Sequence, residues 1–225
     1  YQNIFNVDRL PDNLFVSPGT KAPNRMGFSK YASYINTITE QKYGRPLILA
    51  MSADLSDSTN ISGFAKGYGE AEDKGFYEKT SNIESPLFPQ GITEFTNAGM
   101  MAGASTVNFS TKPYESFSGY YGAVSTYGSF SYLKYGPLRL FSQLAQDSEL
   151  KVGKIIWVVG HSGPETAEDS RTHYGIFAPG VTQLFPNGSI INIHPWEYNE
   201  VAPSLTAALK TDVPIIAIHL TRPSI

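Results

Sequence analysis

Short, uninterrupted apolar runs constrain the fold of this chain more than any other feature of its sequence. The clearest run is 154–159 (KIIWVV), and similar runs stand at 46–51 (PLILAM), 189–194 (SIINIH) and 213–219 (VPIIAIH). Runs of this length without polar alternation are typical of strands that are covered on both faces. Such strands occur in parallel sheets that are flanked by helices.

Stretches with apolar side chains at helical spacing lie between these runs. They are residues 25–41, 94–105, 129–146 and 197–210. A further strand is predicted at 112–117, and the Gly-rich stretch 56–85 is predicted to form loops with one short helix. Short strands that alternate with helices predict an α/β fold, an open and mostly parallel sheet of about six strands with helices on both faces.

The composition excludes several classes of function. The chain has 225 residues, of which 16% are charged, against roughly 25% in an ordinary soluble domain. Its net charge is −3 and it has no block of Lys or Arg, so neither nucleic acid nor a membrane surface is expected as a partner. The absence of Cys excludes a disulfide scaffold, a Cys-ligated zinc site and thiol catalysis.

The first 24 residues differ in character from the rest of the chain. They carry Pro11, Pro18 and Pro23 with several Asn and Asp residues. This composition predicts an extended connector, such as a linker that arrives from an upstream domain.

Polar residues follow the predicted strands, and ligands of parallel sheets bind beyond the carboxyl ends of the strands. The run 46–51 leads into a polar segment that contains Asp54 and Ser58. His161 follows the run 154–159, while His194 and His219 end the last two runs. The search for functional residues therefore centres on this edge of the sheet.

One loop holds His161, Asp169 and His173. These side chains can bind a substrate through directed hydrogen bonds, or they can satisfy local backbone groups, which the spacing alone favours. Two His and one carboxylate also form an iron or zinc pattern, but the usual helical pairing of His ligands is absent, so we expect no metal here.

Gly160–His161–Ser162–Gly163 resembles the start of a nucleophile elbow, the turn that presents a catalytic Ser in one class of hydrolases. That motif needs Gly two residues after the Ser, and this chain has Pro164 there. A serine hydrolase with Ser162 as its nucleophile is therefore only a distant alternative.

Several other residues are unspecific when taken singly. Glu94 begins a predicted helix, where the helix dipole stabilises a carboxylate. Tyr127, Phe130 and Leu133 recur every three residues, which is typical of an ordinary core. Arg25 fits a solvated position at a helix start.

Taken together and in order, these segments resemble the pyrimidine-binding domain of transketolase, a thiamine-diphosphate enzyme. The resemblance rests on Ser52-Ala53-Asp54-Leu55, on Gly91-Ile92-Thr93-Glu94-Phe95, on Thr126-Tyr127 leading to Arg139, on the spacing of His161, Asp169 and His173, and on Pro186-Asn187. It implies the thiamine-diphosphate-binding fold over residues 25–223. Residues 1–24 are then a linker from an absent upstream domain, and 224–225 begin the connection to an absent C-terminal domain.

The resemblance implies that Glu94 is hydrogen-bonded to N1′ of the cofactor's aminopyrimidine ring. Tyr127, Phe130 and Leu133 match the residues that wall this ring, and Asp54 lies at the cofactor end of the first strand. The segment that binds Mg²⁺ and the diphosphate is missing from this sequence. The site is therefore expected to form in a homodimer, or with a partner subunit that carries the diphosphate-binding domain, and the chain alone is expected to be inactive.

The same resemblance implies substrate contacts. His161, Asp169 and His173 would face the sugar hydroxyls, and both His residues would also act on the developing charge of the carbonyl. Arg25 and Ser58 would meet a substrate phosphate.

Two departures from the family pattern concern the substrate. His194 stands where the family usually has a phosphate-binding Arg, and Ser170-Arg171 replaces the usual Gly-Pro. Either Arg171 supplies a cation at a new place, or the acceptor is not a simple sugar phosphate.

The function implied is that of a cytoplasmic transketolase-like transferase of carbohydrate metabolism, which moves a two-carbon ketol unit between sugars or sugar phosphates. The alternatives are a deoxyxylulose phosphate synthase, the beta subunit of a 2-oxo acid dehydrogenase, or a non-catalytic assembly module of the same fold. Ser52-Ala53-Asp54-Leu55 and the two-His loop favour the transketolase type. The low charge content also predicts that the isolated chain associates.

Overall fold

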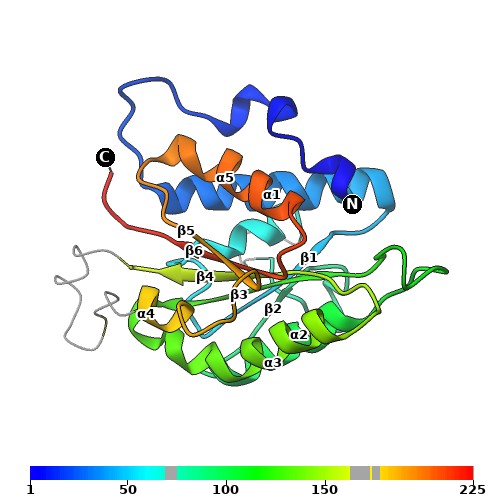
Figure 1. Ribbon diagram of the computed structural model, residues 1–225. Helices are drawn as coiled ribbons and strands as arrows, with labels where there is room; N and C mark the ends of the chain where they lie inside the picture. The colour runs from blue at the N-terminus through cyan, green and yellow to red at the C-terminus, as the bar shows by residue number, and fades with distance from the viewer. Residues whose placement is uncertain (69–74, 163–172, 174–177, 225) are drawn as a thin grey trace.

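The fold is built on a six-stranded sheet whose strands all run parallel (Figure 1). The computed structural model describes residues 1–68, 75–162, 173 and 178–224. The strands are β1 (Ile48–Ser52), β2 (Leu87–Phe88), β3 (Tyr121–Tyr127), β4 (Ile155–Gly160), β5 (Ile190–Ile193) and β6 (Ile215–His219), in the order β2-β1-β3-β4-β6-β5. The expected α/β class and parallel sheet are confirmed.

Helices cover both faces of this sheet, as Figure 1 shows. On one face lie α1 (Asn24–Tyr43) and α5 (Tyr198–Lys210). On the other lie α2 (Glu94–Thr106), α3 (Tyr135–Asp147) and the short α4 (Ala178–Thr182). In the described part of the chain, no helix combines the length and the apolar character that a membrane span requires.

Each face of the sheet has its own hydrophobic core, and β4 contributes to both. Ile156 and Val158 join the core under α1 and α5, whereas Trp157 and Val159 join the core under α2 and α3. Successive side chains of a strand point to opposite faces, so a strand covered on both sides must be apolar at every position. This accounts for the uninterrupted run that the sequence shows.

The start of α1 is fixed to the carboxyl edge of the sheet by Asn24, which is 1% exposed. Its Nδ2 donates to the carbonyl oxygen of Pro195 at 2.8 Å, and its Oδ1 accepts from the backbone N–H of Thr221 at 2.8 Å. The two partners follow β5 and β6 respectively. Arg25, the next residue, is thereby held at the same edge.

The predicted helix 129–146 is two segments. Residues Gly128–Lys134 form the 3-10 helix η6, and α3 starts at Tyr135. Pro137 lies in the first turn of α3, where its missing N–H costs least. The proline therefore marks a helix start within the predicted stretch.

Two expectations about secondary structure are wrong. Residues 112–117 contain a turn at 113–115 and no strand, and Asn108 Nδ2 donates to the carbonyl oxygens of Ser116 and Lys151 beside it. The first residues of the chain are not an extended connector. They form short 3-10 turns, and Phe5 and Leu14 are buried in the core under α1 and α5.

The stretch 56–85 contains, among its described residues, the 3-10 helix η4 (Ile61–Ala65), as expected. Its Gly63 lies against α1, where an added Cβ would come within 2.4 Å of the Ser29 carbonyl oxygen. The close approach of these backbones needs a residue without a side chain at this point.

Candidate functional site

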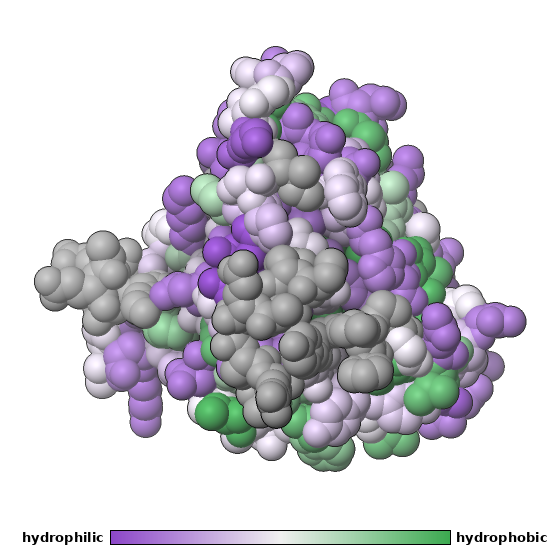
Figure 2. Space-filling view, turned by 90° about the vertical axis from the view of Figure 1, so that its left-hand side faces the viewer, coloured by the Kyte–Doolittle hydropathy of each residue, from purple (hydrophilic) through white to green (hydrophobic). Residues whose placement is uncertain are grey.

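The carboxyl ends of the strands lie on the left in Figure 1, and Figure 2 faces this side. The described surface there is mostly hydrophilic, with separate hydrophobic areas on the lower side, toward α2 and α3. β1 and β3 are neighbours in the sheet. After β1 the chain continues to β2 on one side of this pair, and after β3 it continues to β4 on the other side. Ligands of open parallel sheets bind at such a switch point.

Two non-glycine residues within two positions of a strand end adopt the left-handed backbone conformation. They are Asp54 after β1, with φ 59°, and His161 after β4, with φ 50°. This conformation costs a non-glycine residue of the order of 1 kcal/mol and is concentrated at functional sites. Asp54 is exposed, whereas His161 is only 3% exposed and is packed among neighbouring side chains.

An aromatic cluster, formed by Tyr127, Phe130, His161 and His173, lies at the ends of β3 and β4. The rings of Tyr127 and His161 are stacked, with centroids 4.0 Å apart and an interplanar angle of 18°. His173 meets Tyr127 edge-on at 5.1 Å and Phe130 edge-on at 5.8 Å. Both predicted catalytic His residues therefore contact the predicted ring-binding residues.

Polar contacts join this aromatic cluster to α1 and to the segment after β1. The Tyr127 hydroxyl donates to Ser58 Oγ at 2.9 Å. Arg25 Nη1 donates to the carbonyl oxygen of Ser58 at 3.0 Å and lies 3.5 Å from His161 Nε2. The guanidinium cation is thus held beside the aromatic cluster by a backbone group, which fixes its position.

Glu94 occupies the first position of α2 and is 5% exposed. The hydroxyl of Thr126, near the end of β3, donates to Glu94 Oε1 at 3.0 Å. The helix N-terminus favours negative charge on the carboxyl group. Because Thr126 and Tyr127 are successive residues of one strand, Glu94 lies on the α2 side of β3 and the Tyr127 ring on the opposite side.

Lys134, the last residue of η6, is 0% exposed. Its Nζ has no hydrogen-bond partner among the described residues. Burial lowers the pKa of Lys134 well below its ordinary value, and the charge of Glu94 acts in the opposite direction. A lysine in such surroundings is unusual, because an ammonium group is normally paired when it is buried.

His194 and His219 lie at the ends of β5 and β6. Their rings are stacked, with centroids 4.0 Å apart and an interplanar angle of 11°. His219 Nε2 lies 3.3 Å from Asn192 Oδ1. Burial, with a further contribution from His194, lowers the pKa of His219 to about 3, and burial also lowers the pKa of His194.

The structure thus gathers most of the predicted site residues that it describes. Arg25, Ser58, Tyr127, Phe130, His161 and His173 form one contiguous group. Leu133 is 37% exposed on η6, outside these contacts, and Asp54 is exposed next to β1. Asp169 and Arg171 lie outside the described residues.

Three residues at this edge were not predicted as site residues from the sequence. Thr126 directly precedes Tyr127 in a strand, so their side chains point to opposite faces of the sheet. This alternation was the signal in the sequence that could have placed Thr126 on the side of Glu94. Lys134 directly follows the Tyr127, Phe130 and Leu133 stripe, but a sequence does not reveal that a lysine is buried. His219 ends a strand, a signal that the other His residues share.

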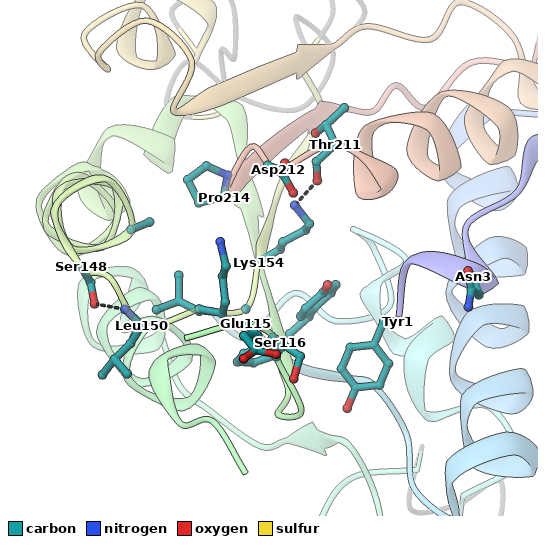
Figure 3. Close-up of a pocket in the computed structure, with 16 residues that line it drawn as sticks. Tyr1, Asn3, Glu115, Ser116, Ser148, Leu150, Lys154, Thr211, Asp212 and Pro214 are labelled. Carbon is teal, nitrogen blue, oxygen red and sulfur yellow. Dashed lines mark hydrogen bonds between the residues drawn. The ribbon is translucent and has the colours of Figure 1, made fainter. Parts of the chain in front are cut away.

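A large cavity lies at the opposite edge of the sheet. Its volume is about 700 Å³, and it is lined by Tyr1, Glu115, Ser148, Lys154, Thr211 and Asp212 among others (Figure 3). Lys154 Nζ donates to the carbonyl oxygens of Thr211 and Val213 at 2.5 and 2.9 Å, and burial lowers the pKa of Lys154 to about 8. This cavity borders the amino ends of β3, β4 and β6, so it is not where a parallel sheet binds its ligand.

An apolar groove runs between α2 and α3, with a volume of about 460 Å³. Phe95, Leu140 and Leu144 line it and are 63%, 68% and 44% exposed. Exposed apolar side chains that gather in this way are typical of protein contact surfaces.

Comparison with known families matches residues 32–225 to the family described as transketolase, pyrimidine binding domain. None of the curated proteins matches the sequence significantly. The family match confirms the predicted resemblance to a transketolase-type pyrimidine-binding domain.

Solved structures with the same fold include transketolases. Transketolase from Leishmania mexicana has a TM-score of 0.66 and 16% identity over 99% of this chain. Transketolase from Campylobacter jejuni has a TM-score of 0.65 and 16% identity over 98% of this chain. This chain covers 29% of each of these two proteins.

A third solved structure is described as a split gene transketolase, an inactive beta4 tetramer. It has a TM-score of 0.53 and 20% identity over 91% of this chain, which covers 53% of that protein. At these identities, the three structures establish the fold that this chain shares with them.

Proposed function

The chain belongs to the family of transketolase pyrimidine-binding domains, and from this premise we propose that it forms the pyrimidine-binding half of a thiamine-diphosphate site. Domains of this family bind thiamine diphosphate. The complete enzyme would transfer a two-carbon ketol unit between sugars or sugar phosphates. The observation that carries the proposal is Glu94, a carboxyl group 5% exposed at a helix start and oriented by the Thr126 hydroxyl.

The residues at the carboxyl edge suit an aminopyrimidine ring. Thr126 occupies one oxygen of Glu94, so Oε2 remains for a ring nitrogen. Thiamine diphosphate, when bound, supplies the reactive carbon that carries the two-carbon unit. Glu94 would hold N1′ of the ring through a hydrogen bond, and the Thr126 hydroxyl would keep the carboxyl group in the orientation that this bond requires.

Aromatic side chains would border the ring and exclude water from it. Tyr127 and Phe130 are candidates, and their contacts with His161 and His173 restrict their rotation. Leu133 would contribute apolar contact without ring stacking, so we expect weaker binding of the ring than with an aromatic residue there.

The substrate would lie on the other side of β3, near the aromatic cluster. Arg25, held by the Ser58 carbonyl oxygen, suits a phosphate group, because a guanidinium binds two phosphate oxygens at once. Ser58 would add a hydroxyl. His161 and His173, together with Asp169, would bind sugar hydroxyls, and the two imidazoles would stabilise charge that develops on the carbonyl oxygen.

The departures at His194 and Arg171 remain part of the proposal. His194 stacks on His219 at the end of β5, where it would border the substrate. Arg171 would supply the cation that the family places elsewhere. If Arg171→Ala binds phosphorylated and unphosphorylated sugars as the unchanged enzyme does, Arg171 has no such role and the acceptor is not a simple sugar phosphate.

The site would be completed by another domain, which binds Mg²⁺ and the diphosphate. Residues 25–223 would be the pyrimidine-binding domain, 1–24 the connection to the upstream domain and 224–225 the start of a connection to a C-terminal domain. A homodimer or a partner subunit would supply the missing half. The split gene transketolase tetramer, described as inactive, supports this division. Tight, Mg²⁺-dependent binding of thiamine diphosphate by the isolated chain in calorimetry would contradict it.

The test of the proposed function is a ketol-transfer assay of the complete assembly with xylulose 5-phosphate and ribose 5-phosphate. Glu94→Gln keeps the shape of the side chain but removes its acid–base function, so we expect activity to fall by about 10²-fold to 10⁴-fold. Glu149→Gln, at an exposed position after α3, is the matched control. Full activity of the Glu94→Gln assembly would overturn the proposed role of Glu94.

A further inference from the structure

The large cavity at the amino edge of the sheet, here named the amino-edge cavity, has no role in the proposed function. Segments 115–117, 150–154 and 211–212 contribute most of its walls (Figure 3). Its volume of about 700 Å³ lies within the range of about 300 to 1,000 Å³ that is usual for small-molecule sites. The cavity is therefore large enough to hold a small ligand.

Backbone hydrogen bonds hold one wall of the amino-edge cavity in place. The N–H of Lys151 donates to the carbonyl oxygen of Pro113 at 2.9 Å. The N–H of Gly153 donates to the carbonyl oxygen of Ser105 at 2.7 Å. Gly153 also lies close to Tyr120, because an added Cβ would come within 2.6 Å of the Tyr120 carbonyl oxygen. The wall is thus fixed between its neighbours, and the fold itself forms the cavity.

Tyr121, the first residue of β3, borders the cavity and is 7% exposed. Its ring is stacked against Phe5 and Phe117, with centroids 6.3 and 5.8 Å away. Its hydroxyl makes no hydrogen bond to another described residue. Burial raises the pKa of Tyr121, and the charges of Tyr1 and Asp212 add to the effect, so the hydroxyl keeps its proton. A buried phenol group is thus left with a hydrogen-bond donor for a ligand.

Lys154 provides a second donor at the buried end of the cavity, where it is 8% exposed. Its side chain points toward Thr211 and Asp212, as Figure 3 shows. Two of its N–H groups donate to the carbonyl oxygens of Thr211 and Val213. An ammonium group has three N–H groups, so one remains. A ligand oxygen that accepts this N–H would form a charge-assisted hydrogen bond.

Charged side chains of both signs line the cavity. Lys151 and Lys154 carry ammonium groups, whereas Glu115 and Asp212 carry carboxylates. Glu115 also forms an exposed ion pair with Lys112 at 3.1 Å. A ligand with a large net charge of either sign would meet like charge in this lining. Hydroxyl groups both donate and accept hydrogen bonds, so a compound with several of them suits this mixture of donors and acceptors.

We propose that the amino-edge cavity binds a small polyhydroxylated compound of the sugar type. Its hydroxyl oxygens would accept from the Tyr121 hydroxyl and the Lys154 ammonium group, and one of its hydroxyls would donate to the Asp212 carboxylate. β3 has seven residues, so the two edges of the sheet lie about 20 Å apart. The site is therefore separate from the carboxyl edge, where Glu94 lies, and it does not depend on the proposed function.

The test is an NMR titration of the backbone amide signals of the chain as it stands with D-ribose. We expect saturable shifts of signals from residues 115–121, 150–154 and 211–212, which surround the cavity. Shifts confined to the carboxyl edge, around Tyr127 and Phe130, would report binding at the proposed substrate site only. Such a result would overturn the proposal.

Three further probes test the class of ligand. Ribose 5-phosphate shares the hydroxyls of ribose, and shifts of the same amide signals by both compounds would support the proposal. Binding of ribose 5-phosphate and inorganic phosphate without binding of ribose would identify an anion site and overturn it. Binding of glycine in place of ribose would identify a site for a zwitterion, with the same consequence.

Variants test the two donors. Tyr121→Phe removes only the hydroxyl, so we expect the dissociation constant of ribose to rise by about 3-fold to 10-fold. Tyr132→Phe, at an exposed position on η6, is the matched control and should leave it unchanged. Lys154→Met should weaken binding at least as much, because a charge-assisted hydrogen bond is lost. If Lys154→Met does not fold, Asp212→Asn, at an exposed position, takes its place. Ribose affinity that these cavity variants leave unchanged would overturn the proposal.

Discussion

At the scale of single residues, the stacked His194 and His219 show how burial controls charge. His219 is 3% exposed, and its pKa is lowered to about 3 because burial disfavours the imidazolium and His194 adds to the effect. In the unfolded chain a histidine has a pKa of about 6.5. The unfolded state therefore binds one more proton than the folded state over the interval between these two values.

This difference predicts how stability depends on pH. The contribution of His219 is fully present above about pH 6.5 and is lost as the pH falls toward 3, by up to about 1.4 kcal/mol per pH unit. His219→Gln keeps a polar group near Asn192 but does not titrate. Urea unfolding at pH 7, 6, 5 and 4 should give a shallower pH dependence for this variant, and parallel curves would contradict the prediction.

At the scale of elements, close contact between helices depends on small residues. Gly27 of α1 faces α5, where an added Cβ would lie 2.7 Å from the carbonyl oxygen of Tyr198. Gly103 of α2 has no atom within 4 Å of the same point. Both glycines lie inside helices, and they differ in how much space is free beside the Cα atom.

Alanine substitutions should therefore have opposite effects. Gly27→Ala forces α1 and α5 apart, and we expect it to lower the free energy of unfolding by about 1 to 3 kcal/mol. Gly103→Ala gains helix propensity without a clash and should raise it by up to about 1 kcal/mol. Equal changes in urea unfolding would show that the contact between α1 and α5 is not tight.

The strands that could be predicted from sequence are those made of large aliphatic residues, such as β4 and β6. The central strand β3 was missed because its sequence, YGAVSTY, has small and polar residues at most positions. These suit a close neighbour: a Cβ at Gly122 would lie 2.9 Å from Cβ of Met101 on α2. Small residues let a helix pack closely on the strand, but they do not form the run of large apolar residues from which a buried strand is predicted. β2 was missed because it is only two residues long.

The candidate site was predictable where it depends on order along the chain, and not where it depends on burial. The resemblance to a family indicated Glu94, Tyr127 and His161, because these residues stand in motifs that can be read along the sequence. Whether the Thr126 hydroxyl reaches Glu94, and whether Lys134 is buried, depends on how β3, η6 and α2 pack, and such packing exists only in three dimensions.

At the scale of the whole molecule, the apolar groove between α2 and α3 predicts association of the isolated chain. Its exposed Leu140 would be covered by a second copy, which also agrees with a low content of charged residues. Leu140→Asp places a charge in the groove, so sedimentation velocity should show a shift toward the monomer. Ile83→Asp, at a loop position that is 66% exposed, is the control. A wild-type chain that sediments as a monomer at high concentration would contradict the prediction.

The sheet order has a consequence for synthesis of the protein. Of the six described strands, β6 comes last in the sequence, yet it lies between β4 and β5 and pairs with both. The residues of β5 are synthesised before those of β6. Until Ile215–His219 have left the ribosome, β5 therefore lacks the strand with which it pairs. One side of the sheet, with His194 and His219, is therefore completed only after β6 has been made. A chain that stops before Ile215 would lose two strands rather than one.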